Sequence, residues 1–526
     1  MARRRAVPAV LLSLLLAAGC TNGPFGKIEQ PNQATTALPA ADTSVVGGAD
    51  AVALALATSQ AIFQSAPAVV LVGADDAGAL ERAGALATQL GIPVLATPKA
   101  APPVSTPEPT PTGTAGSTPA RLAGGDAATD LRAEIDRLKV RAVVTVGSQA
   151  AAWAGGAGLP ASITVSTGDD PAPRDVQRPA PLSSLTVLAT KKGAAGPDAA
   201  AVATANAAGA HVLLLDTADP RATSANVQAI TAETSLDHVL AVGSEFGSAD
   251  QLRQRLSTAK TGVELPGGGQ VLFPGRRLVA IYGHPGDTIL GVLGEQDIDA
   301  SVERAKQVAA PYDALFDEPV VPTFEIIVTV ASGSAGSDGN YSNEFPVDKF
   351  RPWIEAAQQA GIYVVLDLQP GRTDFLTQAK KYQELLLEPN VGLALDPEWR
   401  MGPNQVPGGP IGHVSAQEIN ATGAWLAGLV RDHNLPQKVF ILHWFFLSSI
   451  QNPKQVKTNY DELGMLIQMD GQGGAGQKRD TWAALHNNAP SGIRWGWKNF
   501  YDEDHPTFTP EETVATAVGA VYISYQ

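Results

Sequence analysis

Short apolar runs recur along most of the chain, and between them lie longer segments in which apolar residues repeat every three or four positions. A short apolar run bounded by polar or turn residues is typical of a strand that is buried on both faces, whereas the longer spacing is typical of a helix packed on a sheet. Regular alternation of the two patterns predicts an α/β protein whose parallel sheets are covered by helices.

In the first half of the chain this alternation occurs twice, and we interpret it as an internal repeat. The turns Val146-Gly-Ser-Gln149 and Val242-Gly-Ser-Glu245 end the two copies in the same way. We therefore expect tandem small parallel α/β units. Their strands begin at residues 68, 92, 141, 185, 211 and 236, and their helices cover 50–66, 77–91, 131–140, 199–210 and 222–232.

The second half contains eight strand patterns and seven intervening helical patterns. That number of elements in about 250 residues predicts a (β/α)8 TIM-like barrel, and the alternative is a doubly wound sheet. The expected strands cover 278–284, 323–332, 362–369, 391–396, 438–445, 465–470, 493–500 and 520–525. The expected helices cover 301–315, 348–361, 373–387, 415–433, 453–463, 478–488 and 510–518.

Composition changes between the two halves. All nine Tyr and seven of the eight Trp lie within 276–526, so we expect one domain at 47–265, another at 276–526, and a boundary near 266–270. The net charge of −15 and the pI near 5.0 argue against a nucleic-acid partner. Because no glycine-rich loop has the dinucleotide-binding spacing, we expect no nucleotide cofactor.

The N-terminus has the layout of an export signal, with a basic start and an apolar run too short for a normal membrane-spanning helix. The run ends in Leu16-Ala-Ala-Gly-Cys20, which resembles a bacterial lipobox. This resemblance implies a signal peptide at 1–20 and a lipid on Cys20 that anchors the protein to the outer face of the cytoplasmic membrane. The alternative is an ordinary secretory signal.

Two further segments are expected to lack regular structure. Residues 21–46 are polar, contain Pro and Gly and show no periodicity, which predicts a flexible tether. A Pro/Thr linker occupies 101–118 within the first repeat copy. Since Cys20 is the only cysteine, neither an intramolecular disulfide nor a cluster of thiolate metal ligands is expected.

The repeated pattern resembles the cell wall-binding repeat 2 family. The likeness lies in VVLVGADDAGALERAGALATQLGIPVLAT, at 69–97, and in the later VVTVGSQAA. It covers 48–155 and, more weakly, 185–258. In that family such repeats form small α/β units that bind anionic polymers of the cell wall. The chain departs from the family in having two recognisable copies where three are common, and the alternative role of this half is a structural spacer.

In a barrel, the reactive groups lie at the carboxyl ends of the strands. Nearly every expected strand here ends on a group that can donate, accept or titrate, and tryptophans add flat faces for sugar rings. The candidate catalytic residues are Glu398, Asp396, Asp367 and Asp502. The candidate substrate-binding residues are Tyr282, His284, Arg400, His443, Trp444, Trp495 and Lys498. Each of these residues also has a purely structural alternative, such as a helix cap or a buried core position.

A metal site is not expected, because His284, His443 and Asp396 lack the close ligand spacing of known metal motifs. The central motif is Leu393-Ala-Leu-Asp-Pro-Glu-Trp399, where Asp396 and Glu398 would share one face if the strand stayed extended. Pro397 should end regular strand pairing there.

This motif is similar to one in barrel-fold muramidases of the lysozyme type and in chitinase-like glycosidases. The resemblance implies that Glu398 is the general acid and Asp396 its partner. The chain departs from those families because strand one has no Asp, and because Val391 and Ala394 replace two acids. We expect a glycoside hydrolase-like barrel that acts on or binds a cell-envelope polysaccharide. The alternative is a non-catalytic, wall-binding or structural envelope lipoprotein.

Overall fold

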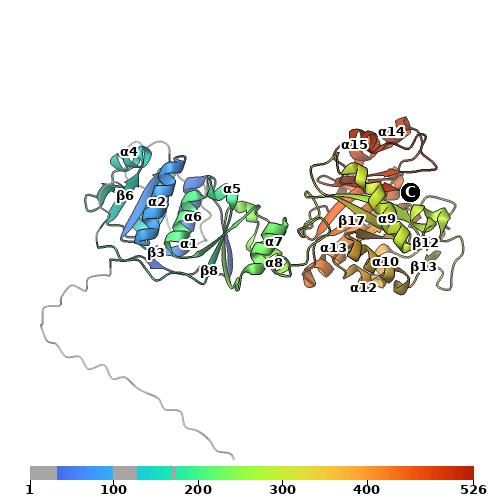
Figure 1. Ribbon diagram of the computed structural model, residues 1–526, viewed down its shortest axis with the longest axis horizontal. Helices are drawn as coiled ribbons and strands as arrows, with labels where there is room; N and C mark the ends of the chain where they lie inside the picture. The colour runs from blue at the N-terminus through green and yellow to red at the C-terminus, as the bar shows by residue number, and fades with distance from the viewer. Residues whose placement is uncertain (1–31, 99–126, 169–172, 174) are drawn as a thin grey trace, which may run out of the picture.

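The computed structural model describes residues 32–98, 127–168, 173 and 175–526. The expected signal peptide, the lipid-accepting Cys20 and the expected Pro/Thr linker lie outside these residues. The described residues form two four-stranded parallel sheets, a closed barrel of eight parallel strands and short strand pairs. The expected fold class is therefore confirmed (Figure 1). Within the described residues, no helix is both long enough and apolar enough to cross a membrane.

The first sheet has the strand order β5-β4-β6-β7, and the second has the order β2-β10-β8-β9. Their strands are β4 (Ala68–Gly73), β5 (Val94–Thr97), β6 (Ala142–Val146), β7 (Thr164–Thr167), β2 (Thr43–Val46), β8 (Leu185–Thr190), β9 (His211–Leu215) and β10 (His238–Val242). The short strands β1 (Thr35–Thr36) and β3 (Phe63–Ser65) pair with each other. The expected tether at 21–46 is thus wrong for its last part, because β2 pairs with β10.

The helices of this half are α1 (Ala51–Ile62), α2 (Ala77–Leu90), α3 (Ala127–Arg137), α4 (Ser148–Gly156), α5 (Lys191–Ala194), α6 (Ala199–Ala207), α7 (Ser224–Ala232) and α8 (Ala249–Lys260). Helices α1 and α2 both pack against α6 (Figure 1). A Cβ on Gly84 of α2 would lie 3.3 Å from the Cβ of Ala203 in α6, so small side chains let the helices approach closely. One apolar core consequently joins both sheets.

All eight strands expected for the barrel are present, and the pairing of β11 with β12 closes it. The barrel strands are β11 (Arg277–Gly283), β12 (Val320–Ala331), β14 (Tyr363–Leu368), β15 (Val391–Leu395), β17 (Lys438–Trp444), β19 (Leu463–Met469), β20 (Arg494–Asn499) and β21 (Tyr522–Tyr525). Strand β13 (Ser342–Glu344) adds to the edge of β12 in antiparallel orientation. Two short strands, β16 (Val414–Ser415) and β18 (Ile450–Gln451), pair with each other.

The barrel helices are α9 (Ile298–Ala309), α10 (Val347–Ala360), α11 (Phe375–Lys381), α12 (Gln383–Leu386), α13 (Ala416–Asp432), α14 (Ala475–Asn488) and α15 (Pro510–Thr516). Ser415 caps the start of α13 by accepting from the backbone of Glu418, and Gly361 ends α10 with a φ of 70°. The helix expected at 453–463 is wrong, because only a 3-10 turn, η7 (Pro453–Gln455), forms there. Bonds to neighbouring segments hold the rest of this stretch. The backbone of Lys457 donates to Asn420, the hydroxyl of Thr458 donates to the backbone of Ser491, and Asp461 accepts from Arg221.

Alternation along the barrel strands separates apolar and polar layers inside the barrel. On β14, Tyr363 and Val365 belong to the apolar interior cluster, and Asp367 follows two positions later at the carboxyl end. Leu272 and Phe273, which precede β11, join the same cluster. The polar ends of the strands therefore form a buried layer at one mouth of the barrel.

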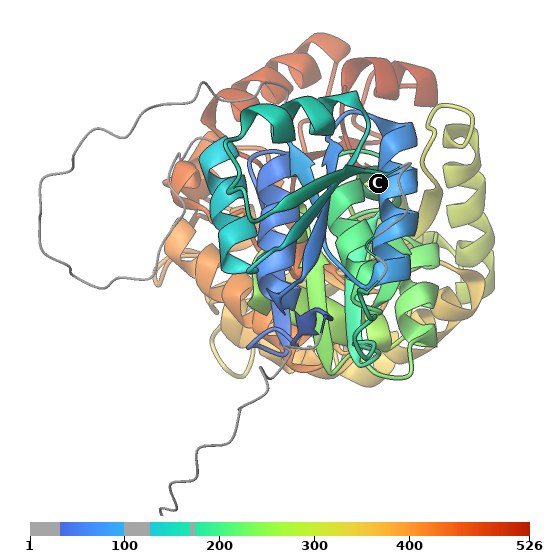
Figure 2. The ribbon, with the colours of Figure 1, turned by 90° about the vertical axis from the view of Figure 1, so that its left-hand side faces the viewer.

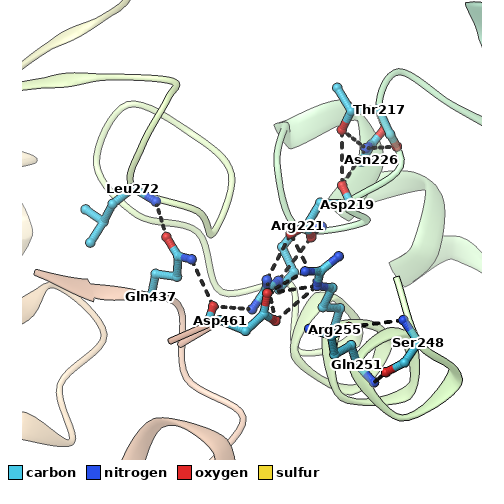
Figure 3. A network of polar contacts seen from close by, with 10 residues as sticks. All are labelled: Thr217, Asp219, Arg221, Asn226, Ser248, Gln251, Arg255, Leu272, Gln437 and Asp461. Carbon is cyan, nitrogen blue, oxygen red and sulfur yellow. Dashed lines mark hydrogen bonds and ion pairs between the residues drawn. The ribbon is translucent and has the colours of Figure 1, made fainter. Parts of the chain in front are cut away.

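The other end of the barrel faces the repeat units, which lie in front of it in Figure 2. Asp461, just before β19, accepts hydrogen bonds from Arg221 at 2.9 Å and from Arg255 at 3.0 Å (Figure 3). Gln437, just before β17, accepts from the backbone of Leu272 at 2.9 Å and donates to the backbone of Asp461 at 2.9 Å. The polar mouth therefore points away from the repeat units.

Replacing Asp461 with Asn should loosen this junction. Arg221 is almost fully buried, and both of its charged partners, Asp219 and Asp461, lie in the junction. Losing one charged acceptor should cost about 1–2 kcal/mol, so backbone amides of α8 should exchange hydrogen roughly tenfold faster. Hydrogen exchange followed by mass spectrometry checks this, with the exposed Asp432→Asn as control. Equal exchange in the two variants would contradict it.

Candidate active site at the barrel mouth

Seven barrel strands place polar side chains at the carboxyl-end mouth. Tyr282, Glu325, Asp367, His443 and Lys498 lie on β11, β12, β14, β17 and β20, and all five are buried. Asp396 directly follows β15 and is 5% exposed. Asp470 directly follows β19 and is partly exposed. Carboxylates outnumber the two basic groups in this layer.

His443 links two of the carboxylates. Its Nδ1 lies 2.7 Å from Oδ2 of Asp470, and its Nε2 lies 2.8 Å from Oε1 of Glu325. Since both partners are acceptors when ionised, the ring donates through both nitrogens only as the imidazolium. Burial by itself lowers the pKa of His443, but the charges of Asp470 and Glu325 raise it well above its ordinary value. His443 is thus a buried cation that balances the acidic layer.

Four further contacts complete the layer. Tyr282 donates its hydroxyl to Asp367 at 2.9 Å, and Tyr522 donates to Glu325 at 2.9 Å. The ammonium of Lys498 lies 3.5 Å from Oδ2 of Asp470 and 3.7 Å from the ring centre of Tyr282. Asp470 is held ionised, because His443 and Lys498 lower its pKa in spite of burial.

Asp396 and Glu398 differ from this bonded layer. Among the described residues, no group donates a hydrogen bond to either carboxyl, and none forms an ion pair with it. Asp396 is buried, whereas Glu398 is partly exposed at the rim. Burial and the charge of Glu398 raise the pKa of Asp396 well above its ordinary value. Burial and the charge of Asp470 raise the pKa of Glu398.

The backbone explains how these two side chains are placed. The chain leaves the extended conformation at Asp396, where ψ is 85°, and Pro397–Trp399 form the 3-10 turn η5. Pro397 thus ends strand pairing as expected, but Glu398 does not continue the alternation of β15. Arg400 does not neutralise Glu398, because its Nε binds Glu418 at 3.0 Å.

The structure brings six of the candidate residues together at the mouth and places five elsewhere. Asp502 is exposed and does not lie in the buried layer. Trp444 is 1% exposed and donates its indole N–H to the backbone of Phe446. The six that meet are Tyr282, Asp367, Asp396, Glu398, His443 and Lys498.

The remaining candidates point to other partners. Trp495 stacks on His486 of α14 with ring centres 3.5 Å apart, so it faces the helix layer rather than the mouth. His284 is buried, with Nδ1 2.7 Å from the backbone oxygen of Ile327 and Nε2 2.6 Å from Lys349. Arg400 is held by Glu418, as described above. These three side chains therefore do not join the candidate site.

Glu325, Asp470 and Tyr522 also belong to the buried layer, although they were not among the candidate site residues. Glu325 stands inside the apolar strand β12, two positions after Thr323 and two before Ile327, on the interior face. A charged residue within an apolar barrel strand is the signal that could have identified it. Asp470 ends its strand in the same manner as Asp396.

The layer suits proton transfer and the stabilisation of positive charge. Within the described ranges, no three His, Cys, Asp or Glu side chains are grouped so that they could hold a metal ion. The pKa of Asp470 is lowered, so Asp470 favours the ionised form, whereas the pKa of Glu398 is raised, so Glu398 holds its proton more tightly. The mouth thus contains two carboxyl groups with opposite protonation preferences. Such pairs assign acid and base roles in acid–base enzymes.

The acidic layer should make stability depend on pH through Asp367. Burial, partly offset by His443, raises the pKa of Asp367 to about 6 from an ordinary value of 3.8. Below pH 4, Asp367 is protonated in both the folded and the unfolded chain, so it costs no stability. As the pH rises toward 6, the unfolded chain ionises Asp367 more readily than the folded chain, so the cost to stability grows. Asp367→Asn should gain on the order of 2 kcal/mol relative to the native chain between pH 4 and 7. Urea unfolding at both pH values checks this, and a constant difference would contradict it.

The barrel has structural likenesses among solved proteins. It is similar to the xylanase and α-amylase inhibitor protein XAIP-II from Scadoxus multiflorus, with 12% identity, a TM-score of 0.28, and coverage of 47% of this chain and 92% of that one. It is also similar to a hyperthermophilic endo-β-1,4-glucanase, with 11% identity, a TM-score of 0.25, and coverage of 47% and 88%. These likenesses concern the fold alone.

The chain is also similar to the cell wall protein Cwp8 from Clostridium difficile, with 15% identity, a TM-score of 0.19, and coverage of 67% of this chain and 49% of that one. This likeness too is limited to the fold. No protein-family model matches the chain. No curated protein matches it either.

Proposed function

We propose that the barrel mouth is the active site of a glycoside hydrolase that acts on a cell-envelope polysaccharide, with Glu398 as the general acid. The observation that carries this proposal is the state of Glu398. Its carboxyl is partly exposed, has no hydrogen-bond or ion-pair partner among the described residues, and has a raised pKa. A general acid must hold its proton near neutral pH and must reach the substrate.

In the proposed reaction, the O–H of Glu398 donates its proton to the glycosidic oxygen as the bond from that oxygen to the anomeric carbon breaks. Positive charge then develops on the sugar ring. The ionised Asp470 supplies negative charge near that ring. A water molecule then adds to the anomeric carbon as Asp470 accepts its proton, which leaves a new hydroxyl on that carbon. Asp367 is fully buried and bonded to Tyr282, so it acts by raising the pKa of Asp396 and not by contact with sugar.

Sugar binding needs a flat apolar face beside the acid, and Trp399 is the candidate. It is the residue after Glu398, on the same turn, and it is partly exposed. Among the described residues, no aromatic ring packs against Trp399. The four aromatic or basic candidates that are fully engaged inside the protein, Tyr282, His284, His443 and Trp444, are assigned structural roles instead.

We further propose the setting in which the barrel works. A lipid on Cys20 would anchor the chain to the outer face of the cytoplasmic membrane. The repeat domain would run from β1 to residue 265, and the barrel domain would occupy 276–526. The repeat units would contact wall polymer. Because the barrel joins them through the end opposite its mouth, this arrangement leaves Glu398 directed away from the repeat units.

The second candidate function is a non-catalytic glycan-binding barrel. The observation that favours it is the internal bonding of the mouth, since His443, Tyr282, Glu325 and Lys498 all have partners within the protein. The experiment that separates the two is incubation of the chain without residues 1–20 with purified cell-wall glycan. Release of new reducing ends supports the hydrolase, whereas co-sedimentation without release supports the binding protein.

A further inference from the structure

The second repeat unit contains a cavity that the barrel chemistry does not use. In its sheet, the chain leaves β8 toward β9 on one side, whereas after β10 it enters α8, which packs against β2 on the other side. In open α/β sheets, ligands bind in the crevice at such a switch point. A cavity of about 320 Å³ lies there, and we call it the switch-point pocket. Its lining includes Thr190, Gly193, Asp198, Gly243 and Glu245.

Asp198 is the unusual group in this pocket. It is 5% exposed, and its buried Oδ2 has no hydrogen-bond partner in the part of the chain that the structure describes. The residue precedes α6, yet its side chain does not cap the helix. Oδ2 lies 1.7 Å from the position that a Cβ on Gly193 would occupy, so glycine makes room for the carboxylate. A buried carboxylate without a partner is costly and calls for an explanation.

Glu245 brings a second carboxylate to the same pocket. Its side chain is exposed, and among the described residues it has no hydrogen-bond or ion-pair partner. Both of its carboxylate oxygens lie within 2.5 Å of the position that a Cβ on Gly243 would occupy. Its charge adds to burial in raising the pKa of Asp198. The two acidic residues therefore line one cavity, and among the described residues neither carboxylate has a hydrogen-bond or ion-pair partner.

The first repeat unit serves as an internal comparison. There Asp76 stands before α2 as Asp198 stands before α6, but it accepts a hydrogen bond from the backbone of Ala79 at 2.9 Å. Gln149 stands where Glu245 stands, and its amide donates to the backbone oxygen of Thr97 at 3.0 Å. Both polar groups are thus satisfied within the protein. The free acceptors are a property of the second unit and do not follow from the repeat architecture.

We propose that the switch-point pocket binds a small polar molecule through a primary ammonium group, which donates hydrogen bonds to both Asp198 and Glu245. An ammonium has three donors and a positive charge, so it satisfies two carboxylates at once. Lys192 also lines the pocket, but it is exposed and can turn toward solvent. This site is independent of the proposed barrel activity.

Titration followed by ligand-observed NMR tests the ligand class, using the chain without residues 1–20. The probes are glucosamine and alaninamide, which represent an amino sugar and an amino-acid amine, and N-acetylglucosamine, whose nitrogen is uncharged. At least one amine probe should bind at least tenfold more tightly than N-acetylglucosamine. Failure of both amines to bind, or equal binding of N-acetylglucosamine, would overturn the proposal.

Two variants locate the site. Asp198→Asn and Glu245→Gln should each weaken binding of the amine probe at least tenfold, because each removes a charged acceptor. Asp237→Asn, on the exposed surface of the same unit, is the matched control and should bind like the native chain. Since Glu245 is exposed, its variant decides the matter even if Asp198→Asn impairs folding. Unchanged affinity in Glu245→Gln would overturn the assignment.

Discussion

Replacing His443 with Gln is expected to destabilise the barrel by about 3–5 kcal/mol at neutral pH, because it removes the buried cation between Glu325 and Asp470. Glu325 would lose its charged partner while fully buried. The neutral amide of Gln can donate one hydrogen bond but carries no charge. Urea unfolding, followed by tryptophan fluorescence, measures the change, since seven of the eight tryptophans lie in the barrel half.

The chain offers a matched control for this substitution. His433 is exposed at the end of α13, and its side chain has no partner among the described residues, so His433→Gln should change the free energy of unfolding by less than about 0.5 kcal/mol. If the two variants unfolded at the same urea concentration, His443 would not be the cation that balances the layer. The assignment of the surrounding charges would then be wrong.

Replacing Glu398 with Gln is expected to lower the hydrolysis rate by about 10²–10⁴-fold, because Gln cannot donate a carboxyl proton to the leaving oxygen. Gln has nearly the same shape, and Glu398 makes no hydrogen bond within the described structure, so stability and glycan binding should change little. Reducing ends released from purified cell-wall glycan measure the rate, and co-sedimentation measures binding.

Glu503→Gln is the control for that substitution. Glu503 is also a glutamate that follows a barrel strand, but its side chain is exposed. This variant should hydrolyse glycan at the native rate. Activity in Glu398→Gln within about threefold of that control would rule out Glu398 as the general acid.

The architecture of the barrel could be predicted because its strands are short apolar runs bounded by turn residues, as in Val391–Leu395. Two local errors have different causes. Strand β2 has only four residues and depends on pairing with β10, nearly two hundred residues later, which no local pattern reveals. The stretch at 453–463 has helical spacing, but tertiary contacts, including those of Asp461 with two arginines, determine its conformation.

The candidate site could be predicted only in part. Ends of parallel strands share one mouth, so Asp367, Asp396 and His443 were expected there and do meet. The alternation of side chains along a strand could also have excluded Trp495. It lies three positions before Lys498 and so must face the opposite side of β20. The sequence does not contain the distances between strands. These distances determine which groups bond to one another and which, like Glu398, stay without a partner.

The most direct measurement of the central claim is a crystal structure of the Glu398→Gln variant of the chain without residues 1–20, bound to a short oligosaccharide from cell-wall glycan. The account predicts that a sugar ring stacks on Trp399 and that the glycosidic oxygen lies within hydrogen-bond distance of the side chain at position 398. Asp396 should lie beneath the anomeric carbon. A sugar bound elsewhere on the protein, with the mouth empty, would contradict the account.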